Sequence, residues 1–188
     1  MKYCWAVAAL LLAAPVFAVS TAHGQYEEKP VVFGFGISGG ASFPLGRFGE
    51  SFDRGYNVGG QVEVAHSRLP AAIRLDAQFN RFETGSAEVN GDILGIGLNA
   101  VMLAKGEMST NARPYLIGGP TWYRLSFGTT EFLGSEAGKS DSRFGFNAGL
   151  GLQFGLSGVK TVIEGRYNWV KTRDGSISFV PVSFGLAF

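Results

Sequence analysis

Residues 143–156, RFGFNAGLGLQFGL, place a large or small apolar residue at every second position, with glycine or a polar residue between. Adjacent side chains of a β-strand point to opposite faces, so this stretch predicts a strand with one continuous apolar face. Such a face has to be covered by a second protein layer or by the hydrocarbon of a bilayer.

Seven further segments alternate in the same way, and none shows a helical period. They cover residues 31–44, 55–65, 71–82, 92–104, 113–127, 159–171 and a last segment that ends at residue 188. Segments of about 10 residues are long enough to cross a bilayer as strands, and closing them into a ring leaves no unpaired edge. The chain is therefore expected to be all-β, an eight-stranded antiparallel up-and-down transmembrane β-barrel preceded by a signal peptide.

The segment 113–127 is the least regular of the eight. Its apolar face is assigned to Tyr115, Ile117 and Tyr123, and the opposite face to Arg124. Pro120 has no N–H to donate to a neighbouring strand, so we expect a bulge or locally broken pairing there.

Aromatic residues of the apolar faces gather near the predicted strand ends, as expected of two belts at the depth of the lipid headgroups. One belt comprises Phe43, Tyr56, Phe79, Tyr123, Phe127, Phe144, Tyr167 and Trp169, and the other comprises Phe33, Tyr115, Phe154 and Phe188.

The first 24 residues read as a secretory signal peptide. Lys2 precedes an apolar run, and small-residue sites allow cleavage after residue 18, 22 or 24. Residues 25–188 would then form the barrel domain. Cleavage removes Cys4, the one cysteine, and brings the formal net charge from +1 to 0 by removing Lys2. A neutral chain without thiols gives no argument for nucleic acid, disulfides or thiol catalysis.

The polar faces predict a network of paired charges inside the barrel. A turn near residues 67–68 would set Glu63 opposite Arg74 and Gln61 opposite Asp76, and a turn at 157–158 would set Glu164 opposite Gly151. Charges in a narrow interior have to be paired, because isolated buried charges are costly. The predicted interior network is Glu63, Arg74, Asp76, Arg124, Arg143, Glu164 and Arg166.

The connections at one end are on balance longer than those at the other, although 172–176 and 105–112 blur the contrast. The longer set (45–54, 83–91, 128–142 and 172–176) is expected outside the cell, and the shorter set (66–70, 105–112 and 157–158) in the periplasm. The third outer loop, with Glu131, Phe132, Leu133, Glu136, Lys139 and Asp141, is the best candidate for contact with a surface partner, although a solvated loop without a partner is the simpler reading.

The whole chain after the signal peptide resembles the small OmpA/OmpX-type outer-membrane barrels. Its last residues, VSFGLAF at 182–188, are similar to the alternating signal, ending in phenylalanine, that those proteins present to the barrel assembly machinery. The resemblance assigns this role to Phe184, Leu186 and Phe188. It also implies that the interior network can gate slow conduction.

Two motifs suggest chemistry but fit the barrel better. Residues 34–39, GFGISG, match a dinucleotide-binding fingerprint, yet they lie within a predicted strand and open no helix. His66 and Ser67 are adjacent, so on a strand they point apart and cannot form a dyad. Once the first 24 residues are removed, one histidine, His66, and no cysteine remain, which gives no metal cluster.

We therefore expect a non-enzymatic, monomeric protein of the cell outer membrane, without a cofactor, surrounded by outer-membrane lipid. Envelope integrity, surface interaction and minor permeability are its expected roles, in that order. The alternatives are a secreted soluble lipocalin-like barrel, which needs an apolar interior, and a lipid A-modifying enzyme, which needs polar catalytic residues on the lipid-facing wall near the outer rim.

Overall fold

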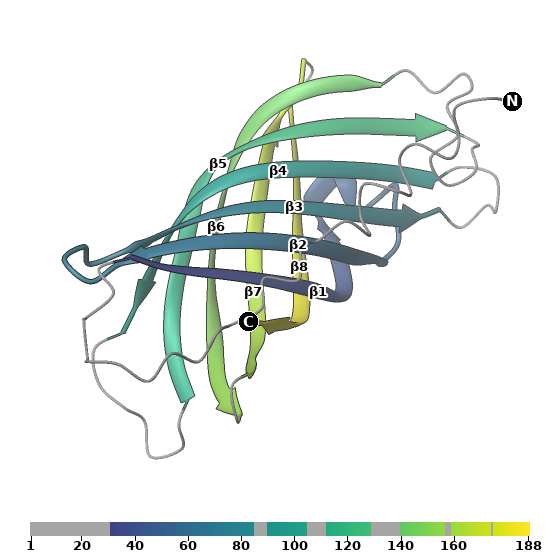
Figure 1. The fold of residues 1–188 in the computed structure, drawn as a ribbon. Coiled ribbons are helices and arrows are strands. Elements are labelled where there is room, and N and C mark those ends of the chain that lie inside the picture. Colours follow the sequence, from purple (N-terminus) through teal and green to yellow (C-terminus); the bar gives the residue numbers. More distant parts are fainter. Residues whose placement is uncertain (1–30, 85–89, 105–111, 129–139, 157–158, 174) are drawn as a thin grey trace, which may run out of the picture.

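The computed structural model describes residues 31–84, 90–104, 112–128, 140–156, 159–173 and 175–188. Within these ranges eight antiparallel strands follow one another in chain order, and β8 pairs with β1 to close a barrel (Figure 1). The strands are β1 (Val31–Leu45), β2 (Gly55–His66), β3 (Ala72–Glu83), β4 (Asn90–Leu103), β5 (Ala112–Gly128), β6 (Asp141–Leu156), β7 (Val159–Lys171) and β8 (Ser176–Ala187). The predicted all-β barrel is confirmed.

The two ends of the barrel differ. The end at which β1 begins and β8 ends, here called the terminal end, also carries the β2–β3 connection at residues 67–71. The opposite end, here called the loop end, carries a short 3-10 helix, η1 (Gly46–Phe48). Gly46 starts this turn with a φ of +56°, in the left-handed region that favours glycine.

The wall of the barrel is apolar on the outside. Phe33, Leu150 and Phe144 are 72%, 65% and 74% exposed, as in the predicted outward phase of their strands. An outside of this kind is stable in lipid and not in water. Of the described residues, none belongs to a helix that is long and apolar enough to cross a membrane.

The predicted registers of the two hairpins are confirmed. Glu63 pairs with Arg74 and Gln61 with Asp76 across β2 and β3, while Glu164 pairs with Gly151 across β6 and β7. Paired residues share a face, so the cross-strand partners of the charged residues also point into the barrel.

Proline interrupts the ladder in two places. The β4–β5 pairing stops at Gly97–Thr121 and resumes at Ala100–Gly118, so Pro120 causes broken pairing without a shift of register. The β7–β8 pairing has the same kind of gap between Gly165–Val182 and Asn168–Phe179. Pro181 accounts for this second gap, because it also lacks the N–H that the ladder needs.

Candidate functional site

The interior of the barrel holds a network of ion pairs in its terminal half. Arg74 of β3 donates from Nε and Nη2 to Glu63 Oε2 at 3.0 and 2.9 Å, and from Nη1 to Glu164 Oε2 at 2.9 Å. The Tyr115 hydroxyl donates to the same Glu164 oxygen at 2.5 Å. Glu164 of β7 therefore joins three strands, because these partners come from β3 and β5.

Arg166 extends the network toward the loop end. It donates from Nε to Glu164 Oε1 and from Nη2 to Asp76 Oδ1, the latter at 2.8 Å. Asp76 also accepts a hydrogen bond from Asn99 Nδ2 at 2.6 Å. The carboxylates thus receive several charge-assisted hydrogen bonds, which offset the cost of burying them.

The network joins three carboxylates and two guanidinium groups. The Arg74 and Glu164 side chains are 3% and 9% exposed, whereas the Glu63 side chain is 25% exposed. Glu164 is therefore deeply buried between two arginines, and Glu63 lies nearer to solvent.

A layer of side-chain amide and hydroxyl groups lies next to the ion pairs, on the side of the loop end. Asn147 Nδ2 donates to Asn99 Oδ1 at 2.8 Å and to Thr121 Oγ1 at 2.7 Å. Asn147 Oδ1 and Asn168 Nδ2 are buried without a hydrogen-bond partner among the described residues, and both residues line a cavity of about 10 Å³. A volume of that size holds about one water molecule, which would hydrogen-bond to these groups.

Apolar clusters lie at both ends of this polar interior. At the loop end Phe48 of η1 packs on Phe82 with ring centroids 5.0 Å apart, and Phe82 packs on Phe179 at 5.5 Å. This aromatic lid comprises Phe48, Phe52, Phe82, Ile93, Tyr123, Leu125, Val170, Ile177 and Phe179. At the terminal end the cluster comprises Ala65, Ala72, Val101, Tyr115, Ile117, Val162 and Ala187.

Six of the seven predicted network residues lie on the inner face of the barrel. The ion-paired network described above joins five of them: Glu63, Arg74, Asp76, Glu164 and Arg166. Arg143 lies on the inner face near the loop end, where it pairs with Asp141 and not with the network.

Arg124 was expected inside the barrel, and this prediction is wrong: its side chain is exposed on the outer wall. The phase of β5 is inverted relative to the expectation, so that Tyr115 and Tyr123 are 2% exposed and point inward. These tyrosines therefore leave the predicted aromatic belts. The space for them comes from glycine, because a Cβ at Gly151 would overlap the Tyr115 ring.

The carboxyl-terminal residues close the barrel seam. Phe188 exchanges two backbone hydrogen bonds with Phe35 of β1, at 3.1 and 2.8 Å, and the two rings stack with centroids 5.4 Å apart. Phe184 and Leu186 face outward on β8, 56% and 37% exposed. Their role as an assembly signal stays a prediction.

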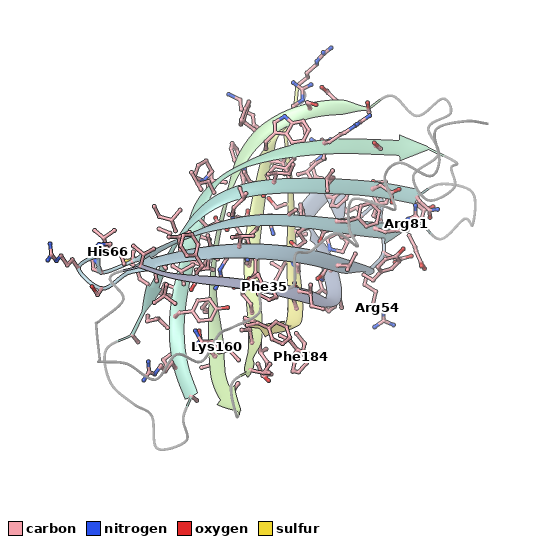
Figure 2. All side chains as sticks on the ribbon, in the orientation of Figure 1. Phe35, Arg54, His66, Arg81, Lys160 and Phe184 are labelled. Carbon is pink, nitrogen blue, oxygen red and sulfur yellow. The ribbon has the colours of Figure 1, made fainter. Side chains whose placement is uncertain are left out.

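Other predicted features are placed only in part. Among the described residues no group of three or more His, Cys, Asp or Glu side chains is arranged to hold a metal ion. His66 lies at the end of β2, at the terminal end, whereas Arg54 and Arg81 mark the loop end (Figure 2). Most of the third outer loop, residues 129–139, and the predicted signal peptide lie outside the described residues.

A closed eight-stranded barrel with an apolar outer wall and an ion-paired interior defines a small membrane-barrel protein. The sequence matches the outer membrane protein beta-barrel domain family over residues 6–188, and the chain belongs to this family. Family membership places it in the outer membrane. No curated protein sequence matches the chain.

Solved structures share the fold at low sequence identity. Neisserial surface protein A is 14% identical with a TM-score of 0.60, covering 84% of this chain and 97% of that one. A major outer membrane protein from Thermus thermophilus is 14% identical with a TM-score of 0.52, covering 84% and 99%. OprG from Pseudomonas aeruginosa is 13% identical with a TM-score of 0.51, covering 82% and 95%.

Proposed function

We propose that this chain is a non-enzymatic outer-membrane barrel with a closed interior, which serves envelope integrity first and surface interaction second. The filled interior carries this proposal. Apolar layers lie at both ends, ion pairs span the terminal half, and the cavity between them has room for about one water molecule. A hydrated ion would have to displace buried side chains to pass.

The orientation of polar and apolar faces argues against a soluble ligand-binding barrel. Such a barrel needs an apolar interior for its ligand, whereas Arg74, Asp76 and Glu164 are buried inside this one and Phe33 and Phe144 are exposed outside. This arrangement is stable when lipid surrounds the outer wall, and it is not stable in water.

The position of His66 argues against the lipid A-modifying enzyme. That chemistry acts at the outer leaflet, and our proposal assigns the loop end to that leaflet. His66 lies at the opposite end, where its Nδ1 accepts a hydrogen bond from the Arg68 N–H at 3.1 Å. This contact stabilises a turn and leaves the ring far from the proposed reaction zone.

Membrane fractionation tests the location, and electrophoresis with and without boiling tests the fold. We expect recovery in the outer membrane and a mobility shift on boiling, because a lipid-stable barrel stays folded in detergent until it is heated. A soluble periplasmic species without the shift would overturn the proposal and favour the ligand-binding barrel.

Planar-bilayer recording tests whether the interior is closed. We expect the refolded full chain to give no sustained porin-like conductance, and brief small openings would support the third role, minor permeability. A steady open-channel current would contradict a closed interior. An incubation with lipid A, followed by mass analysis of the lipid, tests the absence of enzymatic activity.

A further inference from the structure

A hollow of about 820 Å³ lies at the loop end, outside the ion-paired interior. It is bordered by η1 on one side and by the β7–β8 connection on the other. Its lining combines the charged Arg47 and Glu50 with the hydroxyl groups of Tyr167, Ser176 and Ser178.

Two small residues of β8, Ser176 and Ser178, line the hollow. Ser178 pairs with Leu45 of β1 on one side and with Trp169 of β7 on the other. The Tyr167 hydroxyl reaches across to Ser178 Oγ at 2.9 Å. The part of the lining formed by Ser176 and Ser178, here called the floor, therefore carries hydroxyl groups, and the apolar part of the lining includes Leu45, Phe48, Phe52 and Ile177.

The hollow continues directly into the lipid-facing wall. From Ser178 toward the terminal end, the outward face of β8 becomes apolar, and its Val182 and Phe184 are 41% and 56% exposed. Leu45 and Tyr167 themselves point outward and are 39% and 42% exposed. A molecule that filled the hollow could thus keep acyl chains along β8 and a polar head among the hydroxyl groups.

The charges in and beside the hollow favour an anionic head. Arg47 lines it, and the exposed Lys171 pairs with Ser176 at its edge. A guanidinium group binds phosphate by parallel hydrogen bonds, and basic residues near a membrane surface attract anionic headgroups. Glu50 repels phosphate but accepts hydrogen bonds from hydroxyl groups, as serine and tyrosine oxygens also do.

We propose that this hollow binds the head of a phosphorylated glycolipid of the outer leaflet. Arg47 holds a phosphate, while Glu50, Ser176, Ser178 and Tyr167 hydrogen-bond to sugar hydroxyls. The volume and the number of hydroxyl partners favour a sugar over the smaller head of a phospholipid. The assignment rests on the proposed orientation, in which the loop end faces the outer leaflet.

Lipid retention by the refolded full chain tests the site. The protein is placed in phosphatidylcholine nanodiscs with either lipid A or, at equal total charge, phosphatidylglycerol, and the bound lipid is counted by native mass spectrometry. The boiling shift is recorded on each sample, so failure of the barrel is seen separately from failure of the site. We expect the wild-type chain to retain lipid A in preference to phosphatidylglycerol.

Two variants and a control locate the binding. Arg47→Ala removes the phosphate contact and should weaken lipid A retention roughly tenfold, the effect of one lost charge-assisted hydrogen bond. Ser178→Val keeps every charge, fills the floor and should also weaken retention. Arg54→Ala is the matched control, because Arg54 is exposed at the loop end but does not line the hollow (Figure 2).

The outcomes separate a specific site from general attraction. Loss in both pocket variants with an unchanged control would support the site. Equal loss for Arg47→Ala and Arg54→Ala, unchanged retention for Ser178→Val, or equal retention of phosphatidylglycerol and lipid A would each overturn it. A folded wild-type chain that retains no lipid A would overturn it as well.

Discussion

Glu164 is the residue on which the interior network depends most. It accepts hydrogen bonds from Arg74, Arg166 and Tyr115, whereas Glu63 contacts Arg74 and is partly exposed. Replacing this carboxylate by an amide weakens three charge-assisted hydrogen bonds at once and leaves a buried amide N–H facing two guanidinium groups.

Glu164→Gln should therefore lower the free energy of unfolding by about 3 to 5 kcal/mol. Glu63→Gln is the matched comparison and should cost about 1 kcal/mol or less, since that carboxylate contacts one arginine and is 25% exposed, so that solvent screens it. Urea unfolding in lipid vesicles, followed by tryptophan fluorescence, measures both. Equal losses would mean that the network does not centre on Glu164.

Most charged residues of the sequence mark the inner face correctly, but the alternation of residues 113–127 does not give the orientation of the aromatic residues. That alternation predicts Tyr115 and Tyr123 on the lipid-facing side, opposite to their position in the structure. A usable signal was present, because Tyr123 pairs with Gly95 and Tyr115 with Gly151. Both glycines belong to the inner face, and paired residues share a face.

At the scale of elements, the segment after β1 acts as a lid. Phe48 is 7% exposed and packs against Phe82, and Asp53 N–H donates to Glu83 O at 2.7 Å, which fastens the segment to the end of β3. No periodicity of the sequence indicates this packing, since the lid forms only when a loop folds over strands distant in the chain.

Phe48→Ala should destabilise the barrel by about 3 to 5 kcal/mol, because it leaves a cavity among packed rings. It should also raise the frequency of brief conductance events. No steady current is expected, because the ion pairs in the terminal half of the interior stay in place. Unfolding in vesicles and bilayer recording test the two effects. A variant with unchanged stability would show that the lid does not depend on this ring, and Phe43→Ala, on the outer wall, serves as control.

Phe188, the residue that follows β8, has a structural role at the seam and a predicted role in assembly, and these two roles can be tested separately. Phe188→Ala removes the ring that stacks on Phe35 but keeps both backbone hydrogen bonds of the seam. If the ending is the predicted assembly signal, we expect a several-fold loss of folded protein in cells and nearly normal refolding of the purified chain in detergent. The amount of boiling-shifted protein in each setting gives the comparison, and a loss of equal size in both would indicate a structural role alone.

At the scale of the whole molecule, the barrel is stable only with hydrocarbon around its wall. Leu150 lies near the middle of β6 and is 65% exposed, while Val31, on the same outward face as Phe33, is the first residue of β1 and is 38% exposed. The cost of a charge on such a wall depends on its depth in the bilayer.

Leu150→Arg should destabilise the inserted barrel by about 2 to 4 kcal/mol, and Val31→Arg by about 1 kcal/mol or less. Folding titrations in lipid vesicles compare them. A larger cost for Val31→Arg would mean that the bilayer does not surround the wall as proposed.

The sequence by itself determined the number of strands, their order and the inward face of most charged residues, because these follow from a period of two and from short connections. It also determined that Glu63 and Arg74 meet, because neighbouring strands joined by a tight turn have their register set by that turn. Only the tertiary structure decided that Glu164 joins Arg74 and Tyr115, that Arg124 points outward, and that Phe48 covers the loop end. The Glu164 contacts cross the barrel and the Phe48 contact depends on a folded loop, and no local pattern encodes a distance between strands that are far apart in the chain. Arg124 points outward because Tyr115 and Tyr123 of the same strand pack inward beside glycines of the neighbouring strands.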